Sequence, residues 1–224
     1  MGRNAPLSGR VVLLTGADGP AEAMTRRLLS QGARVALAGA VAASAGLATA
    51  PGSRVLALPC NLDSPAETGR VVDTVIDRFG RLDHLVNLVA TRTCPVPLME
   101  LDPLSLSHTL QRDLVMPLAW TQRAYWRWMA AHGGSVVNVV ANAVRDHPQD
   151  TVLAGLTELT EWLAAELTPQ VDVHTLVPNP AFATAAYQAG ITDVLPDVLT
   201  RRGNRIRGPV LVLTEECVDP PRAA

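Results

Sequence analysis

Short runs of aliphatic and β-branched residues alternate with helix-length segments along the whole chain of 224 residues. This alternation is typical of βαβ units, in which consecutive strands run parallel. The runs are apolar almost without interruption, as expected for strands that are covered by helices on both faces. We therefore predict an α/β fold with one doubly wound parallel sheet of seven strands. The predicted strands are residues 11–14, 35–38, 55–58, 84–88, 135–140, 171–177 and 210–213.

The helices between these strands are predicted from helical spacing of apolar residues. They cover residues 21–31, a weak alanine-rich segment at 41–49, and residues 65–79, 103–131 and 151–167. After Thr184 only a short, poorly periodic segment precedes the last strand. No linker or internal repeat divides the chain, so we predict a single domain over residues 1–224, with short tails at 1–9 and 215–224.

Charge and hydropathy exclude several classes of function. The formal net charge is -2 and the basic residues form no cluster, which argues against nucleic acid as a partner. The most apolar stretch, residues 35–50, is too short and too rich in alanine to cross a bilayer, and no secretory signal is readable at the N-terminus. We expect a cytoplasmic protein without membrane contact. The three cysteines are widely spaced and predict neither disulfides nor a metal site.

A family resemblance rests on segments that occur in a fixed order along the chain. They include RVVLLTGADG, LALPCNLDSPAE, VVDTVIDRFGRLDHLVN, GGSVVNVV, LTELTEWLAAEL, LVPNPAFAT and GPVLVL. Together they resemble the short-chain dehydrogenase/reductase family over essentially the whole chain. The resemblance implies a Rossmann-type sheet, a nicotinamide dinucleotide, and a dimer or tetramer. It also implies that the substrate lid is truncated, because only residues 185–207 separate the turn after the sixth strand from the last strand.

The residues at the catalytic positions of that family differ in this chain. Family enzymes use a Tyr as acid/base, a Lys four residues later, a preceding Ser, and an Asn in the long helix. Aligning from LAAEL places Gln149 at the Tyr position and Leu153 at the Lys position, whereas Ala141 stands for the Ser and Asp113 for the Asn. The chain contains no lysine at all. We therefore expect no catalytic residue at these positions.

The cofactor positions are also altered. The loop TGADGPAE retains Thr15, Gly16 and Gly19 but lacks the last glycine of the family pattern, which lets the backbone approach the pyrophosphate. Asn61 replaces an Asp, and Asn87 is the first residue of an altered NNAG motif, whereas Thr184 matches the Thr that touches the carboxamide. We expect no tightly bound cofactor and at most weak binding of NAD(H) or NADP(H).

The two long helices that build oligomers in the family carry most of the tryptophans. Trp120, Tyr125 and Trp128 lie in the segment 103–131, and Trp162 lies in 151–167. These aromatic residues predict either core packing or an interface. We favour an interface with an active homologue of the same family, and add an acyl or peptidyl carrier protein as a further expected partner.

These observations lead to one preferred function and two alternatives. The preferred function is that of a catalytically inactive subunit of a hetero-oligomeric oxidoreductase, similar to the non-catalytic partner subunits of aminocoumarin-type antibiotic pathways. One alternative is an enzyme with non-redox chemistry at Asp113 and His147. The other is a protein that senses a dinucleotide without turnover.

Overall fold

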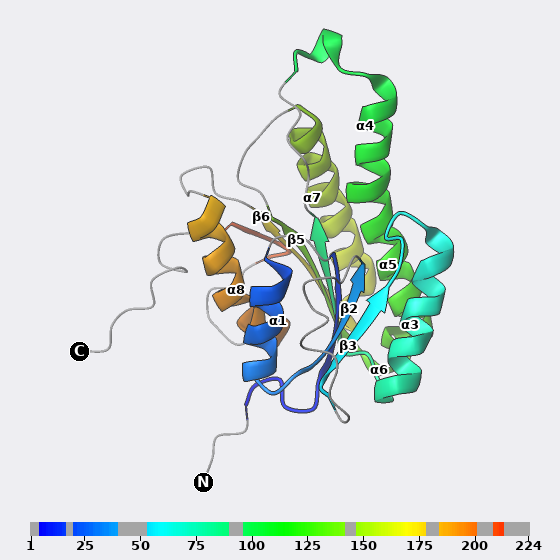
Figure 1. The fold of residues 1–224 in the computed structure, drawn as a ribbon, viewed down its shortest axis with the longest axis vertical. Helices are drawn as coiled ribbons and strands as arrows, with labels where there is room; N and C mark the ends of the chain where they lie inside the picture. The colour runs from blue at the N-terminus through cyan, green and yellow to red at the C-terminus, as the bar shows by residue number, and fades with distance from the viewer. Residues whose placement is uncertain are drawn as a thin grey trace, which may run out of the picture.

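The computed structural model describes residues 5–16, 20–39, 53–89, 96–141, 147–177, 184–200 and 208–212. Seven parallel strands form one sheet in the order β3-β2-β1-β4-β5-β6-β7. The predicted fold class is confirmed, and each predicted strand lies within one residue of an observed one where it is described (Figure 1). The strands are β1 Val11–Thr15, β2 Arg34–Gly39, β3 Val55–Pro59, β4 His84–Val89, β5 Gly134–Val140, β6 Val171–Val177 and β7 Val210–Val212.

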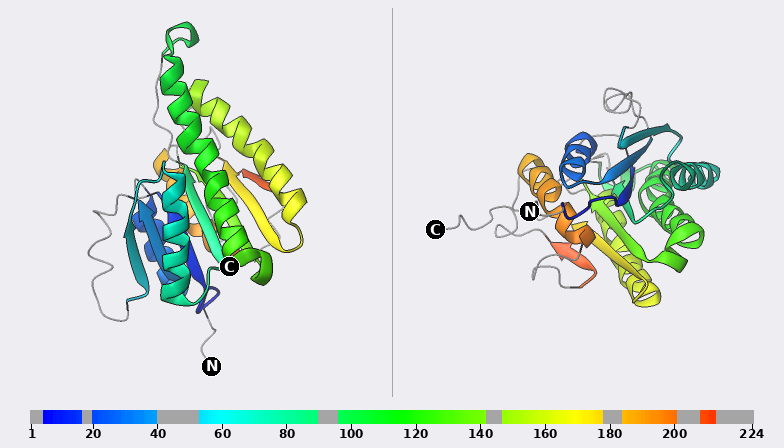
Figure 2. Two further views of the ribbon diagram at one scale, coloured as in Figure 1. Left: turned by 90° about the vertical axis from the view of Figure 1, so that its right-hand side faces the viewer. Right: turned by 90° about the horizontal axis from the view of Figure 1, so that it is seen from below.

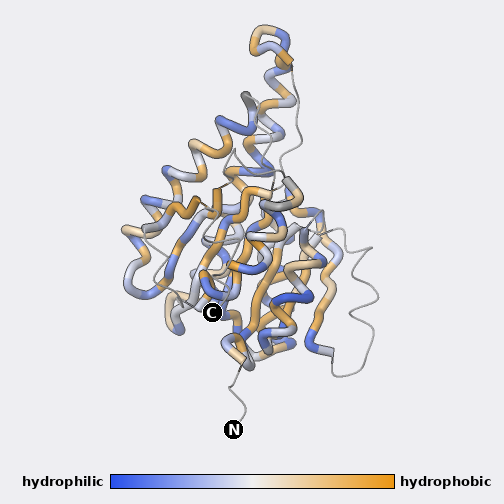
Figure 3. Tube along the Cα trace, turned by 90° about the vertical axis from the view of Figure 1, so that its left-hand side faces the viewer, coloured by the Kyte–Doolittle hydropathy of each residue, from blue (hydrophilic) through white to orange (hydrophobic). Residues whose placement is uncertain are grey.

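Helices cover both faces of the sheet. On one face lie α1 (Ala21–Ser30) and α8 (Thr184–Thr200), and on the other lie α3 (Pro65–Phe79), α5 (Met116–Ala124) and α7 (His147–Leu167) (Figure 1). Each layer encloses its own apolar core, because alternate strand residues point to opposite faces. Hydrophobic residues accordingly follow the strands of the sheet in Figure 3.

The predicted long helix at 103–131 is a continuous rod of five segments. It consists of α4 (Pro103–Leu110), the π-helical η3 (Gln111–Val115), α5, the π-helical η4 (Tyr125–Met129) and α6 (Ala130–His132). A short 3-10 turn, η2 (Leu98–Glu100), precedes it. The left view of Figure 2 shows this rod crossing the sheet and extending beyond the ends of the strands. Its upper half therefore lies next to the carboxyl edge of the sheet, where α/β proteins bind ligands.

The prediction for the segment after Thr184 was wrong. It is a helix of 17 residues, α8, rather than a poorly periodic stretch. Gly190 and the internal Pro196 weaken the helical signal in the sequence. The helix is stabilised by burial instead, since Tyr187, Ile191 and Leu195 are fully buried against the sheet and α1.

Other boundaries differ in smaller ways. The helix α7 begins at His147, four residues before the predicted start. Leu7, in the predicted N-terminal tail, is fully buried, and its backbone N–H donates to the Gln31 carbonyl, so residues 5–9 are part of the packed domain. The weak helix predicted at 41–49 and the tail at 215–224 lie outside the described residues. Among the described helices, none combines the length and apolarity that a membrane span requires.

Candidate functional site

A row of buried polar side chains crosses the sheet near its carboxyl edge. Thr15, Asn87, Asn138 and Thr175 are paired in register on β1, β4, β5 and β6. The Thr15 hydroxyl donates to Asn87 Oδ1 at 3.1 Å, Asn87 Nδ2 donates to Asn138 Oδ1 at 2.9 Å, and Asn138 Nδ2 donates to the Thr175 hydroxyl at 3.3 Å. The row ends at Thr160 of α7, whose hydroxyl lies 2.5 Å from that of Thr175. These bonds link four strands and a helix.

Two of the predicted cofactor residues, Thr15 and Asn87, belong to this row and form hydrogen bonds with other protein groups. Thr15 and Asn87 are 5% and 1% exposed, and Asn87 also donates to the Pro117 carbonyl of α5 at 3.4 Å. A buried amide that is satisfied in this way stabilises the fold and is not available to a ligand. Sequence reasoning missed Asn138 as their partner, although an Asn inside the apolar run GSVVNVV is a readable signal.

Gly16 is required by the backbone at the end of β1. Its φ is +103°, which L side chains rarely adopt, and a Cβ there would lie 3.0 Å from the Leu88 carbonyl oxygen. Its N–H donates to the Ala38 carbonyl at 3.0 Å. Gly16 is thus explained by the chain path, without reference to a phosphate. Gly19, the other predicted loop glycine, lies outside the described residues.

The two remaining cofactor candidates lie at helix starts. Asn61 accepts the Asp63 N–H on its Oδ1 at 3.0 Å and the Ser64 N–H on its carbonyl, so it forms the turn that leads into α3. Thr184 is the first residue of α8, and its side chain is outside the described part of the structure.

Among the candidate cofactor residues, those that the structure describes make contacts within the protein. The polar atoms of Thr15 and Asn87 bond to each other and to the sheet, and the Asn61 carbonyl and Oδ1 accept from its own turn. No lysine exists to hold a ribose.

Three of the positions aligned with catalytic residues of the family carry side chains that do not titrate: Ala141, Gln149 and Leu153. Ala141 follows β5, where its N–H donates to the Val89 carbonyl and its carbonyl accepts from Gln188 of α8 at 3.2 Å. Leu153 packs against a cluster that includes Val89, Val140, Val152 and Leu156. Gln149 is 2% exposed in the first turns of α7. Leu153, which the alignment places at the lysine position, therefore takes part in apolar packing.

The fourth position, Asp113, lies in the π-helical segment η3 and is 3% exposed. Both of its oxygens accept from the guanidinium of Arg112, at 2.9 Å and 2.6 Å. Asp113 and Arg112 therefore form a bidentate ion pair within the rod. His147 begins α7, but its side chain is not among those described, so its pairing with Asp113 stays a prediction.

The two tyrosines of the chain lie on opposite sides of the sheet. Tyr187 is fully buried under α8, where its hydroxyl donates to the Leu176 carbonyl at 3.3 Å. Burial raises the pKa of this phenol far above its ordinary value. Tyr125 lies on the opposite side of the sheet, between α5 and α7. The described His, Cys, Asp and Glu residues also form no group of three that could hold a metal ion.

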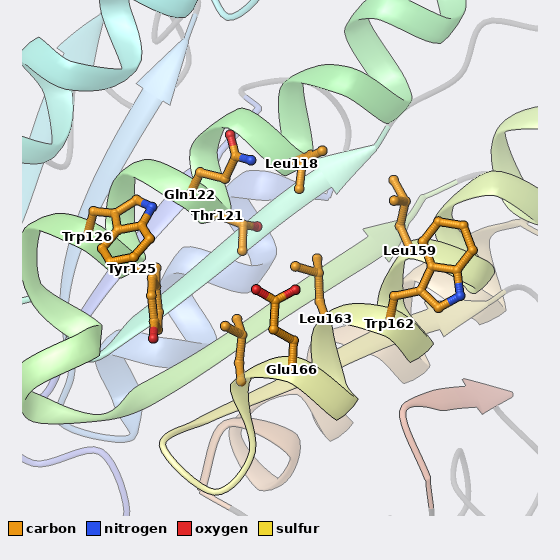
Figure 4. Close-up of a pocket in the computed structure, with 10 residues that line it drawn as sticks. Leu118, Thr121, Gln122, Tyr125, Trp126, Leu159, Trp162, Leu163 and Glu166 are labelled. Carbon is orange, nitrogen blue, oxygen red and sulfur yellow. The ribbon is translucent and has the colours of Figure 1, made fainter.

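A groove of about 280 Å³ separates the outer sides of α5 and α7 (Figure 4). Trp126 and Trp162 stand on its two walls and are 75% and 61% exposed. Val115 and Leu104, which precede Trp126 on the same rod, are also exposed. We call this surface the α5/α7 face. Leu98 and Met99 at η2 are exposed as well.

The predicted interface residues divide between this face and the core. Tyr125 and Trp162 line the groove, and Trp128 is partly buried and stacks on His132 with ring centroids 3.9 Å apart. Trp120 was predicted as an interface residue, but it is 2% exposed and packs in the core between the rod and the sheet, so it is not a surface anchor. The sequence-based assignment overlooked Trp126, because helical spacing alone does not show which side of a helix faces the sheet.

Comparisons with known proteins agree with this fold. A family model described as short chain dehydrogenase matches residues 10–191. A peroxisomal 2,4-dienoyl-CoA reductase of Danio rerio is 27% identical over 176 residues, which cover 71% of this chain but only 57% of the reductase. The hydroxy(phenyl)methylsuccinyl-CoA dehydrogenase subunit BbsD of Thauera aromatica is 29% identical over 170 residues, 72% of this chain and 68% of that protein. A solved short chain dehydrogenase of Burkholderia cenocepacia in complex with NADP has a TM-score of 0.76 and 25% identity, with 93% of this chain and 97% of the other covered.

Proposed function

This chain belongs to the short-chain dehydrogenase family, and on that premise we propose that it is a non-catalytic subunit that pairs with an active homologue and supports it. One observation carries the proposal. Leu153, which the alignment places at the position of the family's catalytic lysine, packs against the cluster that includes Val89 and Val140, and the chain contains no lysine. Proton transfer in this family needs a titratable pair at that place, and the described residues there offer an amide and aliphatic side chains.

The exposed α5/α7 face supports the pairing. Monomeric proteins rarely expose contiguous apolar patches, and such patches mark interaction sites. Trp residues are enriched among the anchors of interfaces, and Trp126 and Trp162 stand on opposite walls of one groove. The Thauera relative is a subunit of a dehydrogenase, which is consistent with a role of this chain in an assembly.

We further propose that the active partner oxidises or reduces a β-hydroxyacyl or related thioester, with the acyl group held by a carrier protein. The names of two relatives specify CoA thioesters, whose acyl linkage is chemically the same. The assignment to natural-product biosynthesis, and to antibiotic pathways in particular, rests on analogy with degenerate family members in such pathways. In this arrangement the partner binds the dinucleotide, and this chain binds it weakly or not at all.

Co-expression tests the proposal. The chain is produced with and without an active homologue encoded beside it, and the masses of both samples are measured in solution by light scattering. We expect a stable hetero-oligomer, and we expect Trp126→Ala together with Trp162→Ala to dissociate it, whereas the exposed α1 variant Arg26→Ala leaves it intact. A partner that is fully active alone and never associates with this chain would disprove the proposal.

A further inference from the structure

Glu166 places a carboxylate in the α5/α7 groove without a cation to neutralise it. The side chain lines the groove and projects into the space between α5 and α7 in Figure 4. Glu161 and Glu158 are exposed about one and two turns earlier on α7, but Glu166 is the only carboxylate among the described residues that line the groove. Among the described residues, none forms an ion pair with Glu166.

The rest of the lining favours a cation. Tyr125 and Trp126 come from one wall of the groove, and Trp162 comes from the other. The rings of Tyr125 and Trp126 meet edge to face, with their centroids 5.0 Å apart. Aromatic faces attract an ammonium or guanidinium group, and the attraction grows when the group leaves water. A carboxylate beside such rings adds a direct charge partner, so the groove is complementary to a basic side chain with an aliphatic stem.

The arginines on the same helices are already engaged elsewhere. Arg123 and Arg127 bind Asp73 of α3, at 3.0 Å and 2.6 Å, on the side of the rod away from α7. Arg112 binds Asp113. The helix α7 itself contains no arginine. A second copy of this chain would therefore bring Glu158, Glu161 and Glu166 to the contact, and like charges at an interface disfavour association.

From these charges we propose that the groove takes an arginine or lysine side chain from a helix of a different subunit. The basic group lies between Trp126 and Trp162 and pairs with Glu166. The inference rests on the proposed pairing with an active homologue, and it names the chemistry that selects this partner over a second copy of the chain. Specificity of this kind combines one attractive contact with repulsion of the wrong partner.

Affinity measurements on the full chain test this. Purified chain is titrated with the purified active homologue by calorimetry, for the natural sequence and for the variants Glu166→Gln and Glu158→Gln. Both glutamates are exposed on α7, but only Glu166 lines the groove. We expect Glu166→Gln to raise the dissociation constant at least about 30-fold, because it leaves a buried cation unpaired, and Glu158→Gln to change it less than about threefold.

The outcomes separate the two proposals. Tight binding that Glu166→Gln and Glu158→Gln weaken equally, or not at all, would overturn the inference and leave the pairing intact. No binding by the natural chain would overturn both. A further measurement is the mass of the chain alone: we expect no stable homodimer, and a Glu166→Arg variant that loses the partner while gaining self-association would support the charge argument. A homodimer of the natural chain that Trp162→Ala dissociates would contradict it.

Discussion

Asn87 Nδ2 and Asn138 Oδ1 form a buried hydrogen bond of 2.9 Å at a rung where β4 and β5 are in register. Both residues also bond to a threonine, Thr15 for Asn87 and Thr175 for Asn138. Polar groups therefore hold together the carboxyl edge of the sheet, which is the edge where doubly wound α/β proteins bind ligands.

We expect Asn87→Ala to lower the free energy of unfolding by about 2–4 kcal/mol, because it leaves the Thr15 hydroxyl and the Asn138 oxygen buried and unpaired. Urea unfolding measures this value. Thr109→Ala, which removes an exposed hydroxyl that bonds to its own helix, is the matched control and should cost less than about 0.5 kcal/mol. Equal effects of the two variants would show that the row contributes no special stability.

Two helical glycines should respond to alanine with opposite signs. A Cβ at Gly155 of α7 would lie 2.8 Å from Leu114 Cδ2 in the adjacent η3, so Gly155→Ala should destabilise the protein by about 1–3 kcal/mol. A Cβ at Gly69 of α3 would meet the flexible end of Arg123 at 3.2 Å, and Gly69→Ala should stabilise by up to about 1 kcal/mol through helix propensity. Thermal unfolding of both variants compares them, and a stabilising Gly155→Ala would refute the close approach of α7 to η3.

The pH dependence of stability should contain a contribution from His84. This imidazole is buried, its Nδ1 lies 2.8 Å from the Ser135 hydroxyl, and its Nε2 has no hydrogen-bond partner among the described residues. Desolvation lowers the pKa of His84 to about 4. Between about pH 6.5 and pH 4 the unfolded chain binds a proton that the folded chain does not, so stability falls as the pH falls through this window, by about 3 kcal/mol.

His84→Gln should flatten the profile in that window. Asp83 beside it titrates lower: burial would raise the pKa of Asp83, but hydrogen bonds from Arg81, the Val11 N–H and Arg10 hold it below its ordinary value. Its contribution is therefore lost only below about pH 4. Unfolding free energies at pH 7, 6, 5 and 4 distinguish the two groups, and an unchanged slope in the Gln variant would contradict the assignment to His84.

The variant Asp113→Asn distinguishes the proposed function of a non-catalytic subunit from the alternative of an enzyme with non-redox chemistry. The substitution removes one charge of the Arg112 pair, whose guanidinium is partly exposed and can turn toward water, so we expect a loss of about 1–2 kcal/mol in unfolding free energy. The activity of the assembled complex should stay within about twofold. A loss of turnover of a hundredfold or more, with assembly intact, would identify Asp113 as a catalytic group and favour the alternative function.

The strands were predictable because the inner strands, such as β1 and β4, are buried on both faces, which leaves an uninterrupted apolar run in the sequence. The helix α8 was not, since burial of Tyr187 and Ile191 overrides the weak propensity around Gly190 and Pro196. The substitutions at Ala141, Gln149 and Leu153 follow from alignment alone. That Leu153 belongs to an apolar cluster depends on packing between helices distant in the chain.

The direction of the aromatic side chains could not be predicted from the sequence either. A regular helix has 3.6 residues per turn, but η3 and η4 are π-helical and wider, so the periodicity shifts twice within one rod. The spacing of Trp120 and Trp128 therefore gave no reliable direction for either ring. In the structure Trp120 faces the sheet and Trp126 faces outward. Which tryptophans form the exposed face is a property of the packed rod.

The most direct test of the central claim is the activity of a complex in which only the partner's chemistry has been removed. The active homologue is prepared with its catalytic Tyr replaced by Phe, combined with the natural chain, and assayed with a β-hydroxyacyl thioester and a nicotinamide dinucleotide, next to the complex with the unmodified homologue. We predict that both complexes assemble with the same mass and that only the unmodified one turns over. Turnover by the complex with the Phe variant, above that of the variant alone, would show that this chain performs chemistry and would contradict the account.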